Sequence, residues 1–154
     1  MGYYVEITEQ EFFLSKENFD EAYKLMCALN DRDDLKMGGS WGQELNADMP
    51  RPEGMTYHPA KWFSWMNANY PETCKNLEDI LTNLGFEIAK DDSFNIAILT
   101  YNSKIGAEGY FFDAIASLVQ DGSYVCWRGE DGEEWRWLFT NGKMITQQAT
   151  KTWV

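Results

Sequence analysis

The chain has 154 residues, of which 44% are hydrophobic, 16% are aromatic and 25% are charged. This length and composition are those of one globular domain, residues 1–154, with enough apolar residues to bury a core. The formal net charge of -12 disfavours direct nucleic-acid binding, which needs a basic surface, and suits a basic partner protein or simple solubility.

The sequence contains neither a basic-then-apolar leader nor an apolar run of about 20 residues, so we expect a cytoplasmic protein without a membrane partner. If the source is viral, the compartment is the host cell cytoplasm. Cys27, Cys74 and Cys126 are far apart and have no metal-ligand spacing. Reduced thiols and no metal or other cofactor are therefore expected.

The first half of the chain begins with a predicted strand or hairpin at residues 3–14, where apolar and polar residues alternate. A helix is predicted next, with Asn18 as its cap and acidic residues in its first turn. Residues 30–57 then lack any periodicity and form a long irregular loop, which carries Trp41. Loops of this length are often functional.

Two helices are predicted after the loop, one from Pro59 to Pro71 and one from Thr73 to Gly85, where glycine ends the helix. A strand pair at 86–90 and 94–101 follows. A fourth helix is predicted at residues 108–119, with five apolar side chains facing inward: Phe111, Phe112, Ile115, Ala116 and Val119.

The last third of the chain predicts a three-stranded antiparallel meander, because alternating runs surround Asp131-Gly132 and Asn141-Gly142. Asp-Gly and Asn-Gly are typical of two-residue hairpin turns. The expected fold is therefore α+β: a mainly antiparallel sheet with this C-terminal meander, packed against about four helices.

A two-residue turn at Asp131-Gly132 would place Arg128 opposite Trp135 and Trp127 opposite Arg136. Both faces of the meander would then be substantially apolar, although an antiparallel sheet usually has one polar face. Three explanations are open: helices cover both faces, a second copy covers one face in a homodimer, or one face is an aromatic surface for a partner.

The candidate binding residues are Trp127, Arg128, Trp135, Arg136 and Trp41. Trp and Arg are common at interface hot spots, and they could also stack a base and pair its phosphate. A pocket under the 31–57 loop could in this way capture a small nucleotide signal. The alternative is that the Trp/Arg pairs only shield the sheet.

Catalysis has weak support, and we predict that the chain is not an enzyme. His58 is the only histidine, and no nucleophile motif, phosphate-binding loop or metalloprotease motif occurs. An enzyme that uses His58 and acidic residues of the long loop, such as Glu53, is the rival hypothesis.

The two ends of the chain resemble a loose group of small uncharacterised bacteriophage and actinobacterial proteins. The resemblance lies in Met1-Gly2-Tyr3-Tyr4, in the Gly129–Arg136 segment Gly-Glu-Asp-Gly-Glu-Glu-Trp-Arg, and in Asn141-Gly142-Lys143. It implies a viral or prophage context and transfers no site residue.

The leading hypothesis from the sequence is a small, acidic, phage-type accessory protein that acts by binding. Inhibition of a host protein, in host takeover or anti-defence, is its expected role. Nucleotide capture, an enzyme and a structural component of the virion are the alternatives.

Overall fold

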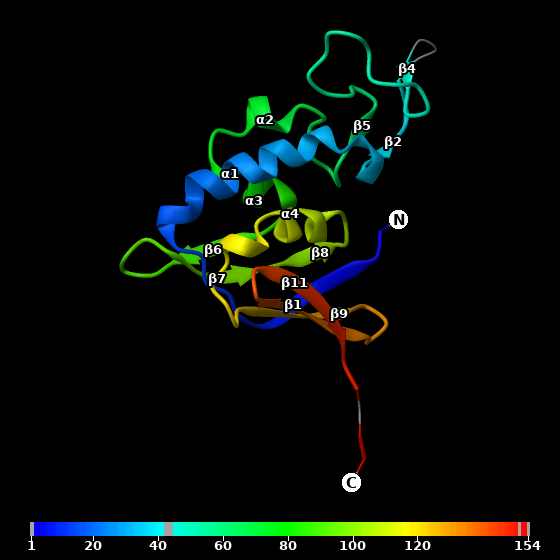
Figure 1. Cartoon of the computed structure of the whole chain (residues 1–154). Coiled ribbons are helices and arrows are strands. Elements are labelled where there is room, and N and C mark those ends of the chain that lie inside the picture. The colour runs from blue at the N-terminus through cyan, green and yellow to red at the C-terminus, as the bar shows by residue number, and fades with distance from the viewer. Residues whose placement is uncertain (1, 42–44, 151, 154) are drawn as a thin grey trace.

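The computed structural model describes residues 2–41, 45–150 and 152–153, and its main feature is a sheet of five antiparallel strands (Figure 1). The order across the sheet is β11-β10-β9-β1-β8, so the first strand lies inside the sheet. The predicted α+β class, the antiparallel sheet and the C-terminal meander are confirmed. The five strands are β1 (Tyr4–Glu11), β8 (Asn102–Lys104), β9 (Tyr124–Gly129), β10 (Glu134–Thr140) and β11 (Lys143–Gln148).

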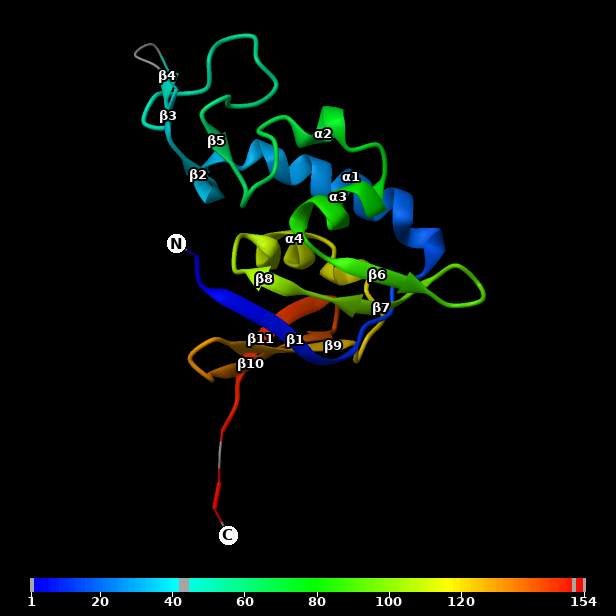
Figure 2. The ribbon, with the colours of Figure 1, turned by 180° about the vertical axis from the view of Figure 1, so that it is seen from behind.

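The helices lie on one side of this sheet, with α4 next to it (Figures 1 and 2). The described α-helices are α1 (Phe19–Ala28), α2 (Tyr70–Thr73), α3 (Leu77–Leu84) and α4 (Glu108–Ala114). Short 3-10 turns occupy Lys16–Asn18, Leu29–Asp31, Asp33–Leu35 and Ala116–Leu118. A cluster of buried apolar residues fills the space between helices and sheet.

Three smaller strand pairs complete the fold. A hairpin of β6 (Glu87–Lys90) and β7 (Ile96–Thr100) confirms the predicted strand pair. Within the long loop, β3 (Ser40–Trp41) pairs with β4 (Leu45–Asn46), and β2 (Met37–Gly38) pairs with β5 (Lys61–Trp62), which follows the loop.

Gly85 ends α3 as predicted, but the helix begins at Leu77 rather than at Thr73, which belongs to α2. Asn76 caps its start, where Oδ1 accepts a hydrogen bond from Asp79 N at 2.9 Å. Gly85 ends it at φ +107°, and Phe86 N donates to Leu81 O at 3.0 Å. This bond closes the usual glycine C-terminal motif. Four apolar side chains of the helix are buried: Leu77, Ile80, Leu81 and Leu84.

The predicted helix from Pro59 to Pro71 is wrong. Residues 59–69 form turns and the strand β5, and Pro71 lies in the first turn of α2 rather than after a helix. Ser64 has φ +50°, a left-handed conformation that a right-handed helix cannot include. Asn18 occupies the N-cap position of α1 as predicted, but its side chain makes no capping hydrogen bond, and its Nδ2 donates to Leu118 O at 3.2 Å.

The fourth predicted helix is confirmed in its first half, since α4 ends at Ala114 and a 3-10 turn continues to Leu118. All five apolar side chains predicted to face inward are buried. They form much of the helix surface that covers the sheet.

The hairpin between β9 and β10 differs from the prediction by one residue. Its loop has three residues, Glu130-Asp131-Gly132, closed by a bond from Gly129 N to Glu133 O at 2.9 Å. Gly132 has φ +90°, and its N–H donates to Gly129 O at 2.9 Å. A type I turn followed by a left-handed residue is the common three-residue hairpin. The predicted pairing of Arg128 with Trp135 is therefore wrong.

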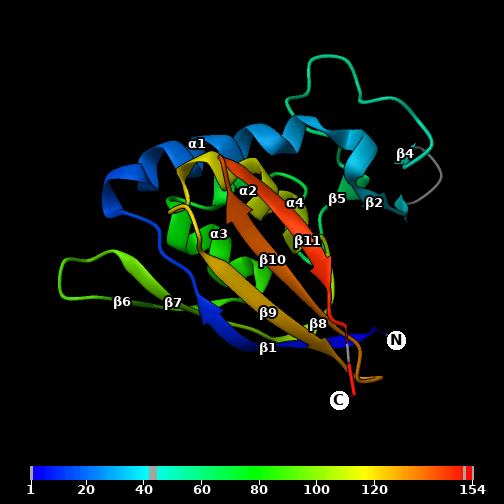
Figure 3. The same cartoon turned by 60° about the horizontal axis from the view of Figure 1, so that its bottom comes forward.

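This shift sorts the indole and guanidinium groups onto opposite faces, because partners across a sheet share a face. Trp127 pairs with Trp135, whereas Arg128 pairs with Glu134 and Cys126 with Arg136. The tryptophans of β9 and β10 lie on the inner face toward the helices. The arginines lie on the outer face, which Figure 3 views from the front. The outer face also carries Tyr124, Cys126, Leu138 and Ile145, so it combines apolar with charged side chains.

The second turn of the meander is as predicted. Thr140 pairs with Lys143 across Asn141-Gly142, whose φ values are +54° and +76°. Two successive positive φ values are the property for which Asn-Gly is favoured in two-residue turns. Ile145 therefore pairs with Leu138 and lies on the outer face.

Candidate binding site: the indole cavity

A cavity of about 470 Å³ lies between the inner face of the sheet and the segment that leads into α4. We call it the indole cavity, because three indoles of β9 and β10 line it. Its lining consists of Val5, Ile105, Gly106, Ala107, Glu108, Gly109, Tyr110, Asp113, Trp127, Trp135, Trp137, Met144 and Thr146. No Lys, Arg or His occurs among these residues.

The three indoles form a continuous wall. The ring centroids of Trp127 and Trp135 are 6.4 Å apart and nearly parallel, at 7°. Trp137 packs against Trp127 with centroids 4.9 Å apart. Trp127 and Trp137 are buried, while Trp135 is partly exposed. The wall is thus anchored in the core and open to a ligand at Trp135.

Glu108 places a buried carboxyl group at this cavity. Its side chain belongs to a residue only 2% exposed, and its Oε1 accepts a hydrogen bond from Gly106 N at 3.0 Å. Oε2 is buried and has no partner in the described structure. Burial raises the pKa of the carboxyl, although bonds from backbone N–H groups oppose part of the shift.

The turn before α4 fits tightly around this carboxyl. A Cβ on Gly106 would come within 2.9 Å of Glu108 Oε2, so a larger residue would displace it. Ser64 Oγ accepts a bond from Ala107 N at 2.6 Å and fixes the turn from the other side. A second polar atom at the cavity, Trp127 Nε1, is also buried without a described partner.

The structure separates the predicted site residues. Arg128 forms an ion pair with Glu6 on the outer face, where both side chains are partly exposed. Arg136 Nε donates to Gln147 Oε1 at 2.9 Å, and its guanidinium lies 5.8 Å from the ring centroid of Tyr124. Neither arginine lines the indole cavity.

A second hollow, of about 550 Å³, brings together Trp127, Trp135 and Arg136. Glu9 and Glu134 also line it, and their carboxylates would repel a phosphate. The described residues of the 31–57 loop line neither of the two hollows, contrary to expectation. Trp41 belongs to β3, and its side chain lies outside the described part of the structure.

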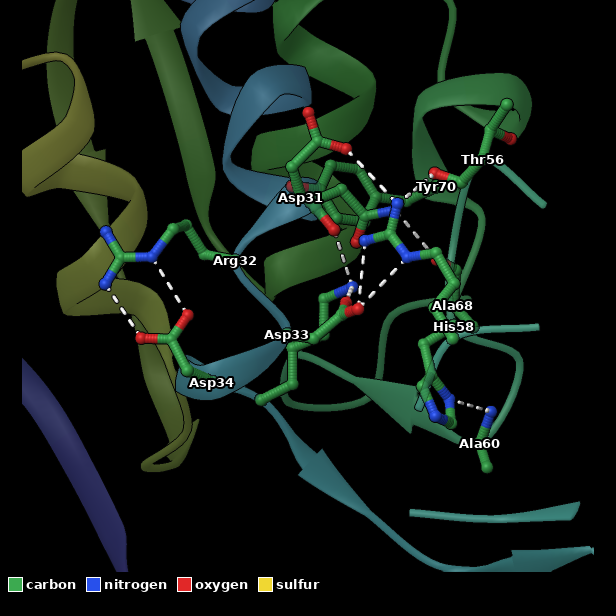
Figure 4. A network of polar contacts seen from close by, with 12 residues as sticks. Asp31, Arg32, Asp33, Asp34, Thr56, His58, Ala60, Ala68 and Tyr70 are labelled. Atoms are coloured by element: carbon green, nitrogen blue, oxygen red, sulfur yellow. Dashed lines mark hydrogen bonds and ion pairs between the residues drawn. The ribbon is translucent and has the colours of Figure 1, made fainter. Parts of the chain in front are cut away.

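The acidic start of the long loop is engaged in ion pairs (Figure 4). Asp33 accepts from Lys36 Nζ at 2.7 Å and from Arg51 Nη2 at 2.9 Å, and these cations lower its pKa despite partial burial. Lys36 Nζ is fully buried and also donates to Asn30 O at 2.7 Å. Asp34 pairs with Arg32 at 2.8 Å. The cluster therefore ties the loop to the end of α1.

His58 is a buried structural residue in this arrangement. Its Nε2 lies 2.7 Å from Met49 O, and its Nδ1 accepts a bond from Ala60 N at 3.1 Å (Figure 4). Nε2 therefore carries the proton and donates it. Both ring nitrogens are engaged by the backbone of the loop.

The cysteines Cys27, Cys74 and Cys126 are free thiols, and burial raises the pKa of each. No group of metal-ligating side chains suited to an ion occurs among the described residues. Within the same residues, no helix is both long and apolar enough to cross a membrane.

Sequence reasoning missed Glu108, Tyr110, Asp113 and Trp137 as site residues. Glu108 has the position of an ordinary acidic residue in the first turn of a helix. Its burial follows from packing against Gly106 and Ser64, which the sequence does not reveal. Comparisons of the chain with protein-family models, with curated proteins and with solved structures found no match.

Proposed function

We propose that the protein acts by binding and that the indole cavity is its binding site. The observation that carries the proposal is a mostly apolar cavity of about 470 Å³ with two buried polar atoms that lack described partners. Ligand sites commonly have this volume and this mixture of apolar walls and a few polar groups. Buried polar atoms without partners are uncommon in folded proteins, and here both belong to residues that line the cavity.

The engagement of His58 favours binding over catalysis. A general base needs a nitrogen within reach of the substrate, and both nitrogens of His58 contact backbone groups instead. The Glu108 carboxyl lies on another part of the fold. The enzyme hypothesis therefore has less support than the binding hypothesis.

Among the binding functions, we favour that of a phage-type accessory protein that binds and inhibits a host protein. The net charge of -12 suits a basic partner. Nucleotide capture has less support, because a phosphate needs cationic side chains and the indole cavity has none in its lining.

The test is a fragment screen by ligand-observed NMR, using small aromatic and small amine fragments. Thr146→Trp introduces a bulky ring into the cavity lining from the edge strand β11. Ile145→Trp adds the same ring to the opposite face of the same strand and serves as the matched control.

We expect fragments that bind the parent protein and Ile145→Trp but not Thr146→Trp. The proposal is wrong if no fragment binds, or if binding is unchanged in Thr146→Trp while the variant is folded by circular dichroism.

A further inference from the structure

The indole cavity combines aromatic faces with negative charge. Its lining includes two carboxyl groups, Glu108 at the start of α4 and Asp113 toward its end. Glu108 is buried, whereas Asp113 is exposed. Lys, Arg and His do not occur among the lining residues, so the described part of the chain places no cationic side chain in the lining.

The cations of the described structure that stack on rings do so elsewhere. Lys16, Lys36 and Lys90 lie over phenylalanine rings at 5.5–6.0 Å, and Arg136 lies over a tyrosine. Indole is the ring that attracts cations most strongly. The indole wall therefore has the surface that best suits a cation, and no described lysine or arginine stacks on it.

We propose that the ligand of the indole cavity is an organic cation, an ammonium or guanidinium group, held by the partly exposed ring of Trp135 in the indole wall and by the carboxylate of Asp113, with the buried carboxyl group of Glu108 nearby. This inference rests on the proposed function and names its ligand class. The source of the cation is a free small molecule or the side chain of a lysine or arginine of a partner protein.

The exposed residues of the lining limit the ligand class. Trp135 and Asp113 supply the indole and the carboxylate that a ligand can reach, whereas Glu108 Oε2 and Trp127 Nε1 are enclosed by protein atoms. The ligand class is thus an ammonium or guanidinium group.

Long-range electrostatics assist this selection. The chain carries a net charge of -12, which raises the local concentration of cations and speeds their association at low ionic strength. An anionic ligand would meet Glu108 and Asp113 without a compensating group in the cavity lining.

The first experiment compares choline with 3,3-dimethylbutan-1-ol, a neutral molecule of the same shape that keeps the hydroxyl. Binding is followed by NMR of the indole N–H signals. We expect choline to bind at least about tenfold more tightly, because only its charged head group gains cation–π attraction.

A second matched pair identifies the source of the cation. A short end-blocked peptide with one lysine is compared with the same peptide carrying norleucine. Preference for the lysine peptide with no preference for choline assigns the cation to a partner chain, and the reverse assigns it to a small molecule. Either preference supports the proposal that the ligand is a cation.

Two Asp→Asn variants test whether choline binds at the indole cavity. Asp113→Asn is expected to weaken choline binding severalfold and to leave the binding of the neutral alcohol unchanged. Asp92→Asn removes the same charge in the exposed β6–β7 turn and is expected to change the binding of neither choline nor the neutral alcohol.

The inference is overturned if neither cation binds more tightly than its neutral partner, or if the two Asp→Asn variants have equal effects. The proposed function survives that result when fragments still bind in the cavity and Thr146→Trp removes them. The two proposals therefore fail on different observations.

Discussion

Trp127→Ala and Arg128→Ala test the register that places indole and guanidinium groups on opposite faces of the sheet. Trp127 is 2% exposed and contacts the rings of Trp135, Trp137 and Tyr101. An aromatic side chain buries about 150–250 Å², which corresponds to roughly 4–6 kcal/mol at about 25 cal/mol per Å². Core substitutions of Trp by Ala cost about 3–5 kcal/mol, so we expect about 4 kcal/mol.

Arg128→Ala has a much smaller expected effect, although it is the next residue along β9. Its ion pair with Glu6 is half exposed, with side-chain exposures of 50% and 37%. Exposed ion pairs contribute about 0–1 kcal/mol to the free energy of unfolding. The losses in free energy of unfolding are therefore expected to differ several-fold between the two variants, although the residues are adjacent on β9.

Urea unfolding followed by far-UV circular dichroism measures both variants, because removal of an indole alters the fluorescence signal. With a slope of about 2 kcal/mol per M, Trp127→Ala lowers the midpoint by about 2 M and Arg128→Ala by less than about 0.5 M. Equal shifts, or a larger shift for Arg128→Ala, would refute the register.

Three further predictions concern the ion pairs and the cavity. Lys36→Met leaves Asp33 with only Arg51 among its cations, and the free energy of unfolding should fall by about 2–3 kcal/mol in urea titrations; an unchanged value would contradict the pairing. Burial raises the pKa of Glu108 above 4.5, so charging it costs stability as pH rises through the raised value. Glu108→Gln should therefore match the parent near about pH 4 and exceed it by about 1–3 kcal/mol near about pH 8, whereas a pH-independent difference would contradict the assignment. Choline binding should be lost in Trp135→Ala and retained in Arg136→Ala, because only the indole lines the cavity; NMR titration of both variants checks this.

The elements that could be predicted are those decided by neighbours in sequence. Gly85 is enough to end α3, and Asn141-Gly142 is enough to define the last turn, whereas the start of α3 at Leu77 was predicted four residues too early. The β9–β10 register needed distant information. Gly-Glu-Asp-Gly fits a two-residue or a three-residue loop, and the loop observed is held by Tyr3, whose hydroxyl donates to Glu133 and accepts from Asp131 N at 3.1 Å.

The candidate site could be predicted only in part, for the same reason. Trp127 and Trp135 were identified from the predicted hairpin and from their residue type, but the arginines beside them in sequence lie on the other face. Glu108 is a candidate site residue only because its side chain is buried. The turn that buries it is held by Ser64, which lies in the segment where the predicted helix was wrong. Tertiary packing decided each of these outcomes.

The interior position of β1 has a consequence for biosynthesis. β1 is translated well before its neighbours β8 and β9, which begin at Asn102 and Tyr124, so β1 stays unpaired on both sides until these distant strands have left the ribosome. Pairings between such distant segments slow folding, and an unpaired edge is prone to aggregation while it waits. Nascent chains stalled before residue 124 should therefore depend on chaperones, whereas released full-length chains should not.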